Sequence, residues 1–153
     1  MWKITRQLQT FTLIFSGLVG SLPVFAAPSH FSNTIGSALL CQDQIDSIFF
    51  TDYMTTYFGK PSKVEGGAYW WKVSSNLFGA KLDSIFVSQE NTSSVFVGAI
   101  FVDVPDALRQ KIQDATGVTY KVTTNPETWS SPSFSVLLKY NSLETPSKLF
   151  CLK

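Results

Sequence analysis

The sequence predicts an α+β domain, in which a mainly antiparallel sheet of about six strands packs with two helices and is closed by one disulfide. Three observations predict this class. Alternating apolar and polar stretches follow one another with short turns, which favours antiparallel hairpins. Two stretches with helical spacing are separated by a run of strands, which favours α+β over a doubly wound fold. Two cysteines lie far apart behind an apparent export signal. The expected order is helix, three strands, helix, three strands.

Residues 1–26 have the parts of a secretory signal peptide. Lys3 and Arg6 give a basic start, residues 11–20 are mostly apolar, and the expected cleavage point follows Ala26. A membrane anchor is the alternative, but the apolar stretch is shorter than the roughly 20 residues that span a bilayer. We therefore expect residues 27–153 to form a single exported domain without a transmembrane segment, periplasmic in a Gram-negative host and otherwise secreted.

The composition excludes several classes of protein. The chain has 12 Lys and Arg residues against 11 Asp and Glu residues, so no basic surface for nucleic acid is expected. It is 44% hydrophobic and only 15% charged, which excludes a disordered chain. The part that follows the signal is long enough for one hydrophobic core and too short for two domains.

Cys41 and Cys151 are expected to form a structural disulfide, because export brings them into an oxidising compartment. The bond would join a segment near the start of the exported chain to the last strand. A redox or nucleophilic pair is the alternative, but a catalytic dithiol usually has close C-x-x-C spacing, which these cysteines lack.

The exported chain is expected to begin with an extended segment, which a helix follows. Residues 27–40 are rich in Pro, Ser, Asn and Gly and predict an extended lead-in. Residues 43–58 have apolar side chains at helical spacing, with Asp43 as the N-cap and Gly59 as a stop signal.

Three strands follow this helix. Trp71 is expected on the face of the first strand opposite to Trp70, and Leu82 and Phe86 are expected to share a face of the second. The third is apolar on both faces, which predicts a central strand covered on both sides. The strands are expected at residues 68–73, 79–87 and 93–102, after a turn at residues 65–67 and with connections at residues 74–76 and 89–92.

The second half repeats the pattern of one helix and three strands. Residues 103–115 have helical spacing, with Pro105 suited to the helix start and Gly117 to its end. Strands are expected at residues 118–123, 134–140 and 147–152, and residues 125–132 are expected to form a loop that holds Trp129.

Few residues suggest catalysis or metal binding. His30 is the single histidine and lies in the loose lead-in, where no partners hold it. The carboxylate pairs Asp43/Asp46 and Asp103/Asp106 could support acid–base chemistry, but their spacing at helix starts is explained more simply by capping. No cofactor motif is recognised, and we expect neither a cofactor nor a metal.

Tyr69-Trp70-Trp71 is the least ordinary segment. If Tyr69 and Trp71 enter the core, alternation places Trp70 outside, beside Lys72. Trp70, Lys72 and Trp129 are therefore a candidate binding patch, because exposed tryptophans anchor interfaces and stack on sugar rings. The alternative is that both tryptophans are core residues.

These observations predict a small, exported, non-catalytic binding domain. Its partner is expected to be a protein, for which it would act as an inhibitor or immunity-type factor, or a glycan of the cell envelope. A carboxylate-dependent hydrolase and a structural or assembly factor of the envelope are the alternatives.

Overall fold

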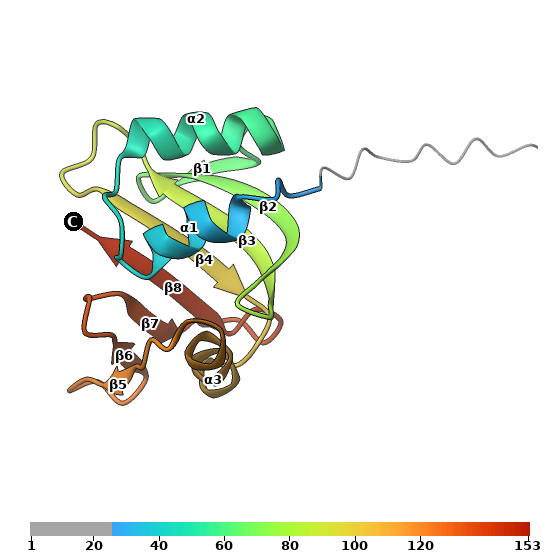
Figure 1. Cartoon of the computed structure of the whole chain (residues 1–153). Coiled ribbons are helices and arrows are strands. Elements are labelled where there is room, and N and C mark those ends of the chain that lie inside the picture. Colours follow the sequence, from blue (N-terminus) through green and yellow to red (C-terminus); the bar gives the residue numbers. More distant parts are fainter. Residues whose placement is uncertain (1–25) are drawn as a thin grey trace, which may run out of the picture.

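The computed structural model describes residues 26–153, so the expected signal peptide lies almost wholly outside the described residues. The described chain forms one eight-stranded sheet and three helices (Figure 1). The helices are α1 (Phe31–Leu39), α2 (Ser47–Phe58) and α3 (Pro105–Thr116). The strands are β1 (Lys63–Glu65), β2 (Ala68–Leu77), β3 (Ala80–Ser88), β4 (Phe96–Phe101), β5 (Lys121–Val122), β6 (Thr128–Ser130), β7 (Val136–Lys139) and β8 (Ser147–Leu152).

The sheet consists of two meanders that join in its middle. Its strand order is β1-β2-β3-β4-β8-β7-β6-β5, and all neighbouring strands are antiparallel. Helix α3 connects the first meander to the second, and β8 returns to pair with β4. The antiparallel α+β class with one disulfide is thus confirmed, whereas the expected counts of six strands and two helices were too low.

Helix α1 occupies the segment that was expected to be a loose lead-in, and that prediction was wrong. Phe31, Ile35 and Leu39 lie one helical turn apart and are almost fully buried. The last carbonyls of the helix gain partners from the chain's other half: Ser133 Oγ donates to Leu40 O and Ser135 Oγ donates to Leu39 O, both at 2.6 Å. Tertiary packing therefore outweighs the weak helix propensity of this segment.

The expected disulfide is present. Cys41 follows α1 and Cys151 lies in β8, with their Cα atoms 5.3 Å apart and 110 residues of sequence between them. The bond fastens α1 to the centre of the sheet.

The other two helices begin and end with recognisable caps. Asp46, and not Asp43 as expected, is the N-cap of α2, where its carboxylate accepts from the backbone N–H groups of Ile48 and Phe49. Helix α3 begins at Pro105, two residues after the start of the expected range 103–115, and Gly117 ends it in the left-handed conformation, as predicted.

The turn between β2 and β3 comes later than expected. Residues 74–76 continue β2, and the chain reverses at Phe78 and Gly79, which both have positive φ angles (57° and 74°) as a two-residue type I′ turn requires. The Gly66-Gly67 turn is confirmed, with φ angles of 61° and 73°, but it joins β2 to a short strand, β1, that was not expected.

In the second meander the strands are shorter than expected, except for β8, which has the expected bounds. Residues 118–123 contribute only the two residues of β5, and Phe134 lies outside β7. Trp129 lies in strand β6 and not in a loop, because Thr128–Ser130 pairs with both β5 and β7.

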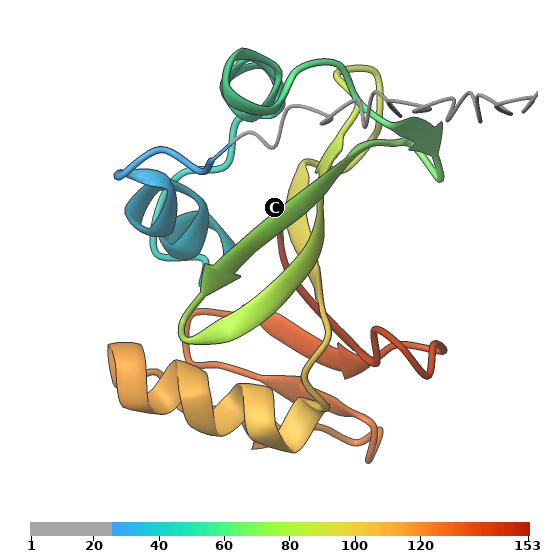
Figure 2. The same cartoon turned by 90° about the vertical axis from the view of Figure 1, so that its right-hand side faces the viewer.

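The core lies between the helices and one face of the sheet, which we call the inner face. All three helices of residues 26–153 contribute to this core (Figure 2). Strand β4 is central, with Val97 and Phe101 on the inner face and Ile100 on the opposite one, all at most 2% exposed, while Val95 is only partly buried. Its second face is covered by side chains of neighbouring strands and not by a second layer of secondary structure.

Candidate functional site

The sheet face opposite to the helices, which we call the open face, holds a small second cluster of aromatic residues. The register of the paired strands places four residues in one row across β2, β3, β4 and β8: Trp70, Phe86, Gly98 and Phe150. A parallel row two residues further along the strands contains the polar and charged side chains: Lys72, Ser84 and Lys148, with Ile100 between the last two.

A bulge in β3 determines which of its side chains reach the open face. The register shifts between Leu82 and Ser84, so that Leu82 enters the inner core whereas Ser84 and Phe86 lie on the open face. The expectation that Leu82 and Phe86 share a face was therefore wrong. The extra residue, Asp83, contacts Ser84 and Lys72.

The Phe86 ring lies over Gly98, its partner on β4. A Cβ atom at position 98 would overlap the ring, with Cζ and Cε2 as the nearest atoms. Trp70 stacks against the same ring, with 4.5 Å between centroids and 30° between planes. The absence of a side chain at Gly98 thus lets Phe86 lie flat, and Phe86 forms the support on which Trp70 rests.

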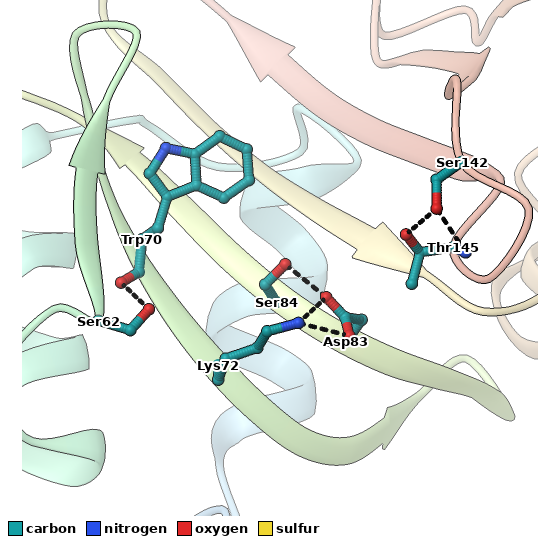
Figure 3. Close-up of polar contacts among 7 residues, drawn as sticks. All are labelled: Ser62, Trp70, Lys72, Asp83, Ser84, Ser142 and Thr145. Carbon is teal, nitrogen blue, oxygen red and sulfur yellow. Dashed lines mark hydrogen bonds and ion pairs between the residues drawn. The ribbon is translucent and has the colours of Figure 1, made fainter.

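Trp70 is partly exposed and is held in a defined orientation. Its indole N–H donates to the Glu65 carbonyl at 3.1 Å, and Lys63 Nζ lies 4.6 Å from its ring centroid. Ser62 Oγ donates to the Trp70 carbonyl at 2.9 Å (Figure 3). Lys63 also pairs with Glu65, and this bond lowers the pKa of the Glu65 carboxyl.

A shallow groove of about 370 Å³ runs beside Trp70. Within it Lys72 Nζ contacts both oxygens of Asp83 at 2.8 Å, and Ser84 Oγ donates to Asp83 at 2.9 Å (Figure 3). Thr145, from the loop between β7 and β8, lies on the far side. The complete lining is Ser62, Lys63, Trp70, Lys72, Asp83, Ser84, Ile100, Tyr140 and Thr145.

The structure does not bring Trp129 together with the other two residues of the expected patch. Trp129 is paired with Leu137, which continues the inner-face row through β8 and β4 to Trp71 on β2. It packs against the inner core, and the Arg109 guanidinium of α3 lies 5.4 Å from its ring centroid. Trp70 and Lys72, by contrast, line the same groove.

Sequence reasoning did not identify Phe86 or Lys148 as members of this face. Phe86 was hidden by the bulge, which has no clear local signal. Lys148 could have been found from Cys151, since a disulfide to a helix places Cys151 on the inner face and alternation then places Lys148 on the open one.

The groove brings together an aromatic ring, hydroxyl groups and charged side chains. In residues 26–153 no three His, Cys, Asp or Glu side chains lie close enough to hold a metal ion. Within the same residues, no helix is long and apolar enough to cross a membrane. Comparisons with protein-family models, curated proteins and solved structures found no significant match.

Proposed function

We propose that this protein is a small exported binding domain that holds its ligand on the open face of the sheet, in the groove beside Trp70. The observation that carries the proposal is the arrangement of Trp70, partly exposed and oriented by hydrogen bonds, on a sheet face opposite to all three helices of the described chain. An aromatic side chain that keeps one orientation on a surface loses little conformational entropy when a ligand stacks on it.

Of the two kinds of partner expected from the sequence, the groove favours a glycan over a protein. Sugar rings stack their C–H faces on indole rings, and their hydroxyls need several polar partners close by. Ser62 and Ser84 each donate a hydrogen bond within the protein, so their oxygen lone pairs remain to accept from ligand hydroxyls.

Export is part of the proposal, and the Cys41–Cys151 disulfide supports it, because such bonds persist in oxidising compartments. Mass spectrometry of the protein from the envelope or medium of its host is expected to find Ala27, within about a residue, as the N-terminus. A chain that keeps Met1 in the membrane fraction would refute export and leave the groove proposal standing.

The binding proposal is tested with two matched tryptophan variants. Immobilised wild type, Trp70→Ala and Trp129→Ala are each incubated with purified envelope polysaccharide and with an envelope protein fraction. Both variants lose the same half-buried side chain, but from opposite faces of the sheet. We expect polysaccharide to be retained by the wild type and by Trp129→Ala and to be released by Trp70→Ala.

Folding of both variants is checked by thermal unfolding before the comparison. Equal retention by all three proteins, or no retention by the wild type, would refute a binding role for the open face. Cleavage of the polysaccharide during incubation would instead support the hydrolase alternative.

A further inference from the structure

A half-buried lysine without a carboxylate partner, Lys148, lies next to Ile100 and Tyr140, two residues that line the groove. Lys148 Nζ lies 4.7 Å from the Phe86 ring centroid, and the rings of Phe150 and Tyr140 lie at 5.7 and 5.9 Å. None of the ion pairs formed within residues 26–153 includes Lys148. Other lysines that lack an ion pair in this part of the chain, such as Lys60 and Lys121, are exposed to water.

The Lys148 ammonium is therefore partly removed from water without a carboxylate to balance its charge. Cation–π attraction to the aromatic faces compensates for part of the hydration energy that the ammonium loses. Burial nevertheless lowers the pKa of Lys148, because removal from water disfavours the charged ammonium. An anion beside the ammonium would restore the missing interaction, and it would do so in a partly desolvated place where a charge pair is stronger than on an open surface.

Building on the proposed function, we propose that the ligand of the open face is an acidic saccharide: one sugar ring stacks on Trp70 in place of the exposed Lys63 ammonium that lies over the indole, and a carboxylate or phosphate substituent pairs with the Lys148 ammonium.

The separation of the two groups suits such a ligand. Both contact the Phe86 ring, Trp70 at 4.5 Å and Lys148 at 4.7 Å, so the indole centroid and the ammonium are at most about 9 Å apart, the sum of the two distances. One or two linked sugar rings bridge such a distance. Tyr140, whose ring centroid lies 5.9 Å from Lys148 Nζ, also lines the groove, so the cation lies close to one part of the groove wall.

Lys148 differs in this respect from the lysines that line the groove. Lys72 is held by Asp83 and Lys63 by Glu65, so their charges are already compensated within the protein. A lysine that already pairs with a carboxylate gains less from a ligand anion than a lysine without such a partner. The acidic group is therefore assigned to Lys148.

The test uses three saccharide probes of defined chemistry: a galacturonic acid hexamer, a glycerol-phosphate teichoic chain and a neutral galactose hexamer. Binding to the purified exported domain is measured by titration calorimetry. The variants are Lys148→Gln, Lys148→Arg and, as the matched control, Lys139→Gln, which removes an exposed lysine from the neighbouring strand. The two acidic probes distinguish a carboxylate from a phosphate ligand.

We expect the wild type to bind at least one acidic probe more tightly than the neutral hexamer. Lys148→Gln is expected to weaken that binding at least about tenfold, as the loss of a hydrogen bond to a charged group does. Lys148→Arg should restore most of the affinity, and Lys139→Gln should leave it unchanged.

Three results would overturn the acidic-saccharide proposal. If the neutral hexamer binds the wild type as tightly as the acidic probes, and Lys148→Gln binds it equally well, the proposed glycan function stands and its acidic ligand does not. If Lys139→Gln weakens binding as much as Lys148→Gln, the attraction is non-specific. If no probe binds, the acidic ligand fails, and retention of envelope polysaccharide by the immobilised protein decides separately whether the proposed function fails with it.

Discussion

The contact between Phe86 and Gly98 supports the ring on which Trp70 rests, and an alanine at position 98 tests it. An added Cβ would overlap the Phe86 ring, which is only 2% exposed and cannot turn aside freely. Overpacking of this kind costs about 1–3 kcal/mol. Alanine in place of glycine within a strand returns about 0.5–1 kcal/mol through lower chain entropy. The net expectation is a loss of about 1 kcal/mol in the free energy of unfolding, within a range of roughly 0–2.5 kcal/mol.

The measurement is urea unfolding followed by tryptophan fluorescence. The control background is Phe86→Leu, which removes the ring that overhangs Gly98. In that background Gly98→Ala should be neutral or slightly stabilising, so the double-mutant cycle should show a coupling of about 1–3 kcal/mol. A Gly98→Ala protein that is as stable as the wild type, with no coupling to Phe86, would contradict the proposed packing of the open face.

Three further predictions concern stability. Replacing Cys41 and Cys151 with serine should cost about 2–5 kcal/mol of unfolding free energy, since the chain-entropy model assigns about 4–5 kcal/mol to a loop of this length; a variant as stable as wild type in urea would contradict a structural role. Val97→Asp should abolish cooperative folding, because it places a charge on a fully buried central strand; a cooperative thermal transition in that variant would mean that the strand is misplaced. Burial raises the pKa of Tyr120 to about 12, so the folded state retains a proton that the unfolded state loses from about pH 10. The shifted pKa of Tyr120 therefore makes the free energy of unfolding depend on pH. Its stabilising contribution is fully present below pH 10 and falls by about 3 kcal/mol as the pH rises from 10 to 12. Tyr120→Phe should therefore be less sensitive to pH than wild type in this range, and equal pH dependence of the two proteins would refute the assignment.

The sequence predicted some elements well from signals that lie in or beside them, but clear alternation alone was not sufficient, since residues 118–123 contribute only two residues to a strand. Strand β8 has the expected bounds, and α3 is ended by Gly117 as expected and begins at Pro105, two residues after the start of the expected range 103–115. The signal for α3 was its boundary residues, and the signal for β8 was a short, mostly apolar segment that follows the turn region at residues 141–146. Both signals lie in or beside the element itself, so no knowledge of the rest of the fold is needed to read them.

Helix α1 could not be recognised as readily, because its stability comes from the rest of the chain. Its sequence, FSNTIGSAL, contains many residues with weak helix propensity. Its ends and its position depend on Ser133, Ser135 and the disulfide, which are about 100 residues away in sequence. Phe31, Ile35 and Leu39 were the available local signal, and their spacing was masked by the polar residues between them.

The candidate site was only partly predictable for a related reason: the face on which a strand residue lies depends on register. Trp70 could be placed outside because the adjacent Trp71 enters the core. Trp129 has no such neighbour, and its face is set by pairing with Leu137. The bulge at Asp83 similarly reverses the alternation of β3, and nothing in the local sequence marks it clearly.

The disulfide connects this register to the proposed function. Cys151 must face the inner side to reach Cys41 at the end of α1, and alternation along β8 then places Leu149 on the inner face and Lys148 and Phe150 on the open one. A slip of one residue in β8 would turn the cation toward the core and the cysteine away from its partner. The bond that fastens α1 to the sheet therefore also holds Lys148 among the aromatic rings beside the groove.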